Sequence, residues 1–125
     1  MYSSRMRLVL LLSVVVVSCL CILFATKYTM LKLRVDFAAG QIATIEEMKT
    51  AAGETTDPHK LSGQLQYVVS YYPSGSKQFN GTSLDRVVET ARSNAVAAII
   101  AHLRATTGKD LANDPEAWFK EYAPK

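Results

Sequence analysis

The stretch YYPSGSKQFNGTS, residues 71 to 83, holds the densest mixture of side chains that could do chemistry. Within it, Ser74 and Lys77 have the Ser-x-x-Lys spacing of serine acyl-transfer enzymes, in which the serine is the nucleophile. That chemistry places the lysine one helical turn after the serine and needs a Lys-Thr-Gly element elsewhere in the chain. No Lys-Thr-Gly occurs in this sequence, so we predict that neither residue is catalytic.

Proline and glycine instead predict a turn in this stretch. Pro73 and Gly75 both interrupt a helix and favour a tight turn. Such a turn would expose two aromatic rings and one amine, which belong to Tyr72, Lys77 and Phe79. We predict that these three residues form a candidate interaction surface.

A second candidate site is centred on His102, which has apolar neighbours in the sequence. A histidine in a pocket can act as an acid or a base when a carboxylate lies within reach. The aromatic residues Tyr67, Tyr71 and Trp118 would complete such a pocket. This alternative describes a small exported ligand-binding or enzymatic domain, whereas the leading hypothesis is a protein that is not an enzyme.

No metal or cofactor site is predicted. The two histidines, His59 and His102, stand 43 residues apart and neither has a cysteine nearby. A tetrahedral metal site would have to be completed by scattered carboxylates. Gly108 and Lys109 lack the upstream glycine of a phosphate-binding loop. Both cysteines lie in an apolar segment near the N-terminus, so no disulfide is expected in the rest of the chain.

That apolar segment runs from Leu8 to Ala25 and contains 18 residues without a charge. As a helix it would span about 27 Å, nearly the thickness of the hydrocarbon layer of a bilayer. Basic residues flank it on both sides, as is common at headgroup depth. We predict an uncleaved signal anchor, which makes the chain a single-pass protein of the cytoplasmic membrane with the lipid bilayer as one partner.

Two other processing routes remain open for the segment. In a lipoprotein, Val16-Val17-Ser18-Cys19 would be the cleavage box and Cys19 would be acylated, although the residues after it stay apolar. In a cleaved signal peptide, a small-x-small site should follow, and Leu23 spoils the one that ends at Ala25. The leader before the segment has only seven residues, so we expect residues 27 to 125 to be extracytoplasmic.

The charge balance argues against nucleic acid as a partner. From Asp36 onward the chain has nine basic and eleven acidic side chains, because five of the fourteen basic residues flank the apolar segment. A nucleic-acid binder should instead present a clustered basic face.

Periodicity predicts a helix, a loop and a strand in the middle of the chain. Apolar residues from Leu31 to Ala52 recur at intervals of three and four, which indicates a juxtamembrane helix. Residues 53 to 63 contain Gly, Asp-Pro and Ser-Gly and predict a loop or linker. Residues 64 to 72, QLQYVVSYY, are rich in β-branched and aromatic side chains and predict a strand, which would need a pairing partner.

Two further helices are predicted toward the C-terminus. Thr82 is a suitable N-cap and Gly108 a suitable C-terminal stop for a long core helix. Asp114 and Pro115 suit the start of a short helix. The rings of this short helix, led by Trp118, are expected to pack over small residues of the core helix.

The segment TGKDLANDPEAW resembles a motif of the form TGxDLxxDPxxW, which occurs near the C-terminus of small exported or membrane-anchored bacterial proteins and beside HEAT-type repeats. The likeness covers roughly residues 70 to 122. It implies an exported α-rich module and carries no catalytic residue with it.

The sequence therefore predicts a mainly α fold with a minor β element. The expected order is a transmembrane helix, a juxtamembrane helix, one strand or hairpin, a long core helix and a short C-terminal helix. We predict a membrane anchor over residues 1–26, a juxtamembrane helix over 27–53 and a small extracytoplasmic domain over 54–125. The expected role is protein interaction or assembly, with a protein partner or by self-association.

Overall fold

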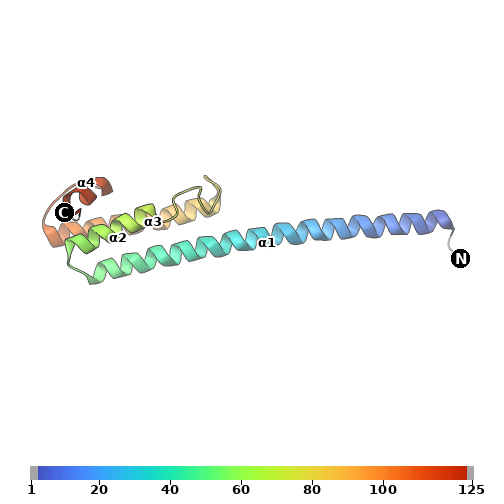
Figure 1. Ribbon diagram of the computed structural model, residues 1–125, viewed down its shortest axis with the longest axis horizontal. Helices are drawn as coiled ribbons and strands as arrows, with labels where there is room; N and C mark the ends of the chain where they lie inside the picture. The colour runs from blue at the N-terminus through green and yellow to red at the C-terminus, as the bar shows by residue number, and fades with distance from the viewer. Residues whose placement is uncertain (1–2, 124–125) are drawn as a thin grey trace. The chain divides into compact units, whose positions relative to one another are not determined.

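The computed structural model describes residues 3–123, which form four helices and contain no strand (Figure 1). They are α1 (Ser4–Glu54), α2 (Pro58–Ser70), α3 (Ser83–Thr107) and α4 (Pro115–Glu121). The chain divides into an N-terminal unit that ends at Arg34 and a C-terminal unit that begins at Val35. The predicted minor β element is therefore wrong for the described part of the chain.

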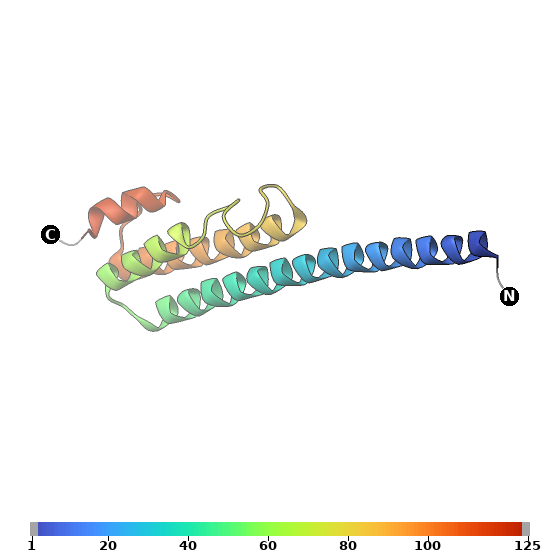
Figure 2. The ribbon, with the colours of Figure 1, turned by 45° about the vertical axis from the view of Figure 1, so that its right-hand side comes forward.

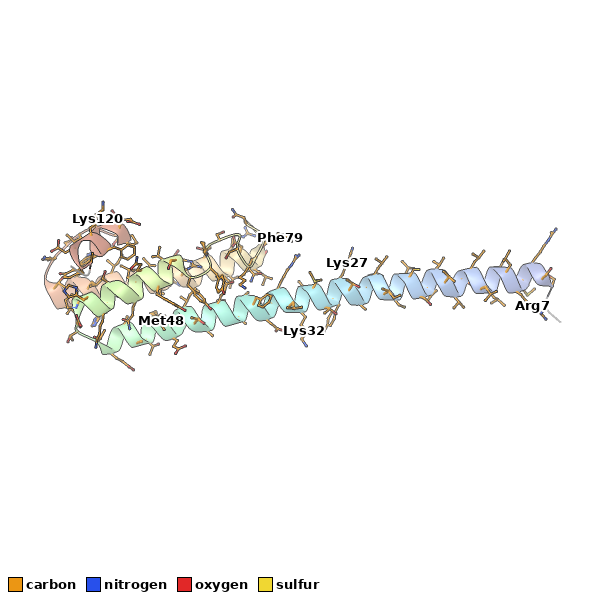
Figure 3. The ribbon with its side chains drawn as sticks, viewed as in Figure 1. Arg7, Lys27, Lys32, Met48, Phe79 and Lys120 are labelled. Atoms are coloured by element: carbon orange, nitrogen blue, oxygen red, sulfur yellow. The ribbon has the colours of Figure 1, made fainter. Side chains whose placement is uncertain are left out.

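The N-terminal unit is the first part of α1, and every side chain from Leu8 to Ala25 in it is exposed (Figure 3). Hydroxyl groups in this stretch donate to carbonyls of the preceding turn, as Ser13 Oγ does to Val9 O at 3.0 Å. Such bonds satisfy the hydroxyl groups of side chains within a helix. Within residues 3–123, α1 is the one helix that is long and apolar enough to cross a membrane.

Beyond Arg34, α1 continues without a break and contributes one wall of the C-terminal unit. Its buried residues are Ala38, Gln41, Ile45 and Ala52, at intervals of three, four and seven. The predicted apolar periodicity is thus correct from Ala38 onward, whereas Leu31 and Val35 are exposed. The predicted stripe omitted Gln41, a polar residue that is only 5% exposed.

The prediction of a strand over residues 64 to 72 is wrong, because most of this stretch belongs to helix α2. Leu61, Leu65 and Val68 are fully buried, and their spacing of four and three places them on one side of a helix. Intrinsic strand preference is worth at most about 1 kcal/mol and depends on neighbours that pack on a sheet. Here no neighbouring strand exists among the described residues, and a helix pairs its own backbone groups.

The predicted linker over residues 53 to 63 is also shorter than expected, because only residues 55–57 lie between α1 and α2. Asp57 is the N-cap of α2 and its side chain accepts a hydrogen bond from His59 N at 3.0 Å. Pro58 takes the first helical position, where no amide donor is needed. The Asp-Pro pair is thus a helix start and not a loop signal.

The predictions for the two C-terminal helices are confirmed. At the start of α3, Thr82 Oγ1 accepts a hydrogen bond from Asp85 N at 3.3 Å, and Gly108 ends the helix with a φ of 69°. At the start of α4, Asp114 accepts a bond from Glu116 N at 3.1 Å and Pro115 follows it. These local capping contacts explain why the sequence defines both helices.

In the C-terminal unit, α2, α3 and the part of α1 beyond Arg34 run side by side (Figures 1 and 2). The core is formed by the buried side chains of all three, and α4 adds Trp118, which is fully buried. Contrary to the expectation that its rings would cover the core helix, α4 packs chiefly against α2. The hydroxyl of Ser62 donates to Trp118 O at 3.4 Å across this contact.

Removing the cap of α2 tests the helical assignment of the predicted strand. We expect Asp57→Ala to lower the free energy of unfolding of the full chain by about 1 kcal/mol, because an amide at the helix start loses its acceptor. Thermal unfolding followed by circular dichroism measures this. Thr56→Ala is the control, since Thr56 is exposed and makes no hydrogen bond within the described residues. Equal behaviour of the two variants would contradict a capped helix at this position.

Candidate functional site

The loop that joins α2 to α3, residues 71–82, contains the three residues predicted as an interaction surface. It is built from two turns, in which Ser76 N donates to Pro73 O at 3.0 Å and Thr82 N donates to Phe79 O at 3.1 Å. Gly75 and Gly81 have φ values of 85° and 77°, which glycine adopts without strain. The predicted turn is therefore present, and we call this segment the connecting loop.

The carboxylate of Asp85, in the first turn of α3, binds three residues of the connecting loop. Asp85 Oδ2 accepts a hydrogen bond from Ser74 Oγ at 2.6 Å and one from Gly81 N at 3.0 Å. Asp85 Oδ1 accepts a bond from Gly75 N at 3.4 Å. These donors keep the pKa of the Asp85 carboxyl below its ordinary value, with the Ser74 hydroxyl as the largest cause and the Gly81 amide next. The ionised form therefore fastens both turns to the start of α3.

The first residues of the loop are held by a buried arginine. Arg92, which is 7% exposed, donates from its guanidinium to Val68 O and, at 2.9 Å, to Tyr72 O. Its Nε lies 3.1 Å from Glu89 Oε1, so the charge is paired. Gln41 Nε2 of α1 also donates to Tyr72 O at 3.1 Å. The backbone of Tyr72 has a φ of 40°, a strained value for a non-glycine residue, and these two bonds hold it there.

The aromatic rings beside this backbone form a continuous series. Tyr67 and Tyr71 stack at a centroid distance of 5.2 Å, and Tyr71 meets Tyr72 edge to face at 4.8 Å. Lys77 Nζ lies 4.4 Å from the centroid of the Tyr72 ring and 5.1 Å from that of Phe37. An ammonium at such distances is attracted by the negative face of each ring. We call Phe37, Tyr72 and Lys77 the aromatic-lysine cluster.

Beside this cluster lies a hollow of about 310 Å³. Its lining combines two opposite charges, three aromatic rings and two hydrogen-bonding side chains. The residues are Asp36, Phe37, Gly40, Gln41, Thr44, Tyr71, Tyr72 and Lys77. All of them belong to the C-terminal unit.

Of the three predicted surface residues, the structure brings Tyr72 and Lys77 together and leaves Phe79 largely open to solvent. The side chains of Phe79 and Tyr72 are 62% and 44% exposed. Ser74 and Lys77 do not face one another as a nucleophile and base would. Ser74 binds Asp85, and Lys77 lies over the two rings.

The residues predicted around His102 have separate partners. His102 Nε2 lies 2.8 Å from Thr55 O, in the connection between α1 and α2. Trp118 Nε1 donates to Ala112 O at 3.2 Å, and its ring stacks on Tyr122 at 6.3 Å. Tyr67 and Tyr71 belong to the aromatic series described above. The histidine therefore has a structural hydrogen bond to the backbone in this arrangement.

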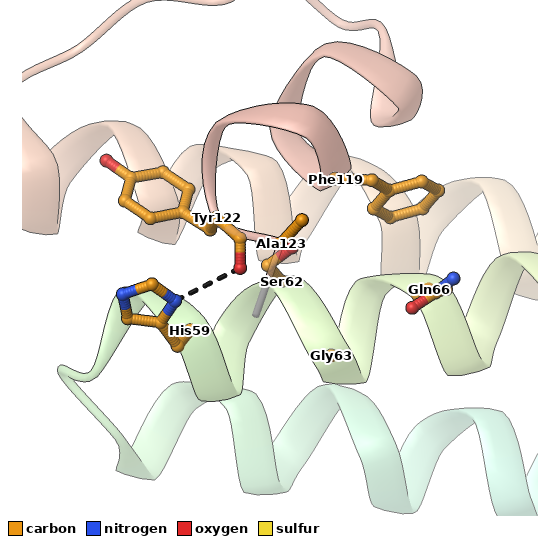
Figure 4. A pocket seen from close by; sticks show the side chains of 7 residues that line it. All are labelled: His59, Ser62, Gly63, Gln66, Phe119, Tyr122 and Ala123. Carbon is orange, nitrogen blue, oxygen red and sulfur yellow. Dashed lines mark hydrogen bonds between the residues drawn. The ribbon is translucent and has the colours of Figure 1, made fainter. Parts of the chain in front are cut away.

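A second hollow of about 510 Å³ lies between α2 and α4 (Figure 4). His59 is at its edge, where Nδ1 lies 3.0 Å from Tyr122 O and the two rings meet edge to face. Ser62, Gly63 and Phe119 also line it. The contact joins the start of α2 to the end of α4, so His59 belongs to a helix interface and not to the predicted linker.

The TGxDLxxDPxxW-like segment has structural contacts along its length. Asp110 Oδ1 accepts a bond from Arg104 Nε at 2.9 Å and one from Ala112 N at 3.1 Å. Ala112 O in turn accepts from Trp118 Nε1. Leu111 packs against the core. The segment therefore contains the end of α3 and a connection whose hydrogen bonds fix the position of α4.

Sequence reasoning missed the buried side chains that hold the loop. Arg92 falls between Val88 and Ala95 at helical spacing, so its periodicity indicates burial even though its charge suggests exposure. Gln41 follows Ala38 in the same way. Among residues 3–123, no group of three or more His, Cys, Asp or Glu side chains is placed to hold a metal ion.

Comparison of the chain with protein-family models, curated proteins and solved structures finds no match. The class that the fold defines is a helical protein with one long apolar helix near its N-terminus and a compact helical C-terminal unit. Its function is inferred from the contacts described above.

Acid titration tests the role of Asp85. Its lowered pKa means that the unfolded chain takes up a proton at a higher pH than the folded chain does. The stabilisation is thus fully present above the ordinary pKa and is lost as the pH falls through the lowered one. We expect Asp85→Asn to be less stable than the native chain at pH 7 and to approach it at pH 3 in thermal unfolding.

The control for this titration is Glu47→Gln, an exposed carboxylate of α1 that makes no hydrogen bond or salt bridge within the described residues. We expect it to follow the native chain at both pH values. A difference between native and Asp85→Asn that stays the same from pH 7 to pH 3 would contradict the stabilising role of the ionised carboxylate.

Proposed function

We propose that the chain is a single-pass membrane protein, not an enzyme, whose C-terminal unit mediates protein interaction or assembly. The observation that carries this proposal is the connecting loop. Two charged side chains with little exposure, Asp85 and Arg92, are used to hold a loop that presents Phe79 and Tyr72 to solvent.

The membrane part of the proposal is supported by the N-terminal unit. A helix of a water-soluble core buries its apolar side, but α1 exposes every side chain from Leu8 to Ala25. Contiguous apolar surface of this extent is not stable in water. A lipid bilayer covers it on all sides, and Lys27 and Arg7 then stand near its two ends. We propose that the C-terminal unit is extracytoplasmic.

The proposed role in protein interaction is supported by the buried charge that holds the connecting loop. Burying a charge is unfavourable unless it is paired and hydrogen-bonded, and Arg92 meets both conditions through Glu89 and two carbonyls. A simple connection between two helices does not need such an arrangement. An ordered loop with exposed rings and an amine loses little conformational entropy when it binds, which favours recognition of a partner.

Membrane attachment is tested by fractionation of cells that produce the full chain with a C-terminal tag. We expect the chain to stay in the membrane after alkaline carbonate treatment, with the tag accessible to protease only from the extracytoplasmic side. Cys19→Ser should behave in the same way, because a spanning helix does not depend on its thiol. Loss of an acyl group and of membrane retention in Cys19→Ser would instead identify the lipoprotein route.

The interaction surface is tested by cross-linking of the full chain in native membranes, with a photoreactive amino acid at position 79. We expect a discrete cross-linked product, either with one protein or with a second copy of the chain. The pair Lys77→Ala and Phe79→Ala should abolish co-purification of the same species in mild detergent without lowering the unfolding temperature by more than a few degrees.

The matched control places the photoreactive group at Val87, an exposed apolar residue of α3. The variant pair Lys60→Ala and Val87→Ala matches the chemical change at two exposed sites outside the connecting loop. Equal cross-linking from positions 79 and 87, or a chain that is strictly monomeric and without a partner in native membranes, would refute the proposed role of the loop.

A further inference from the structure

The hollow beside the aromatic-lysine cluster contains two opposite charges that have not paired. Asp36 and Lys77 both line it, yet neither forms a salt bridge within residues 3–123. The amine of Lys77 is held by rings instead of by a carboxylate. Both charges are thus available to a ligand that carries the complementary pair.

The rings of the cluster already show that they accept an ammonium. Lys77 Nζ lies 4.4 Å from the Tyr72 centroid and 5.1 Å from that of Phe37. Lysine has a long flexible side chain, and its attraction to exposed rings is weak. A ligand ammonium can therefore take this place while Lys77 turns to an anionic group.

We infer that the hollow binds a small zwitterion in which a phosphate and an ammonium are separated by a short linker, as in phosphoethanolamine and phosphocholine. The ligand's ammonium lies over the rings of Phe37 and Tyr72 and is attracted by Asp36. Its phosphate is bound by Lys77, and Gln41 and Thr44 line the same space. This site goes beyond the proposed protein interaction and does not involve Phe79.

Charge complementarity selects the zwitterion over simpler ions. A lone anion is attracted by Lys77 and repelled by Asp36, and a lone cation experiences the reverse. Discrimination by such a repulsive element is a general route to specificity. The hollow, at about 310 Å³, lies at the lower end of the range for small-molecule sites, which suits a headgroup-sized ligand.

The test uses the full chain in maltoside micelles, which carry no charged headgroup, and titration calorimetry. Phosphoethanolamine and phosphocholine should bind saturably to the native chain, whereas choline alone and inorganic phosphate alone should bind at least tenfold more weakly. Asp36→Asn should weaken zwitterion binding about tenfold. The control Glu47→Gln removes an exposed carboxylate from the same helix and should leave binding unchanged.

The variant Lys77→Gln gives a signature that general misfolding would not. It removes both the phosphate-binding amine and the resident ammonium from the rings, so preference should shift from the zwitterion to choline. No saturable binding by the native chain, equal affinity for choline and phosphocholine, or no effect of Asp36→Asn and Lys77→Gln would overturn the proposal.

A second arm identifies the source of the ligand. Dihexanoyl phosphatidylethanolamine, below its micellar concentration, carries the same headgroup on two short acyl chains. Binding at least tenfold tighter than phosphoethanolamine assigns the site to a lipid headgroup, and equal binding assigns it to a soluble zwitterion. Asp36→Asn should weaken zwitterion binding but leave the cross-link from position 79 unchanged. Failure of the zwitterion site can therefore be distinguished from failure of the proposed protein interaction.

Discussion

The arrangement of helices in the C-terminal unit depends on hydrogen bonds to one atom, the carbonyl oxygen of Tyr72. It accepts hydrogen bonds from Arg92 of α3 and from Gln41 of α1, and it lies just beyond the end of α2. Both donors are less than a tenth exposed, so water is a poor substitute for their shared acceptor. One backbone group thus connects three helices, and the positive φ of Tyr72 is a local cost of placing it there.

The same constraint determines what the connecting loop can present. With its Tyr72 carbonyl held by Arg92 and its two turns held by Asp85, the loop carries Lys77 to the rings of Phe37 and Tyr72. The rings, the amine and Asp36 then surround one hollow, although they come from two distant parts of the chain. An element that joins two helices therefore also has the order that a binding surface needs.

Helix α1 has one continuous backbone but two stretches that differ in their side chains. Its first part has no polar side to face water, while its second part buries Ala38, Ile45 and Ala52 against α2 and α3. A helix satisfies its own backbone hydrogen bonds, and for that reason no break is required where the pattern of side chains changes. The side chains alone distinguish the two stretches.

The sequence by itself determined the features that depend on neighbouring residues. The apolar run from Leu8 to Ala25, the Thr82 cap, the Gly108 stop and the Asp114-Pro115 start are short-range patterns with local causes. They were predicted because each depends on contacts within about one helical turn.

Tertiary structure decided what depends on distant partners. QLQYVVSYY has strand-forming side chains, but burial of Leu65 and Val68 against α3 and the Asp57 cap make most of it helical. The docking of α4 on α2, the burial of Arg92 and the joining of Asp36 to Lys77 around one hollow have the same origin. Local preferences amount to a few tenths of a kcal/mol per residue, whereas a buried side chain contributes about 1.5–3 kcal/mol, so long-range packing prevails where the two disagree.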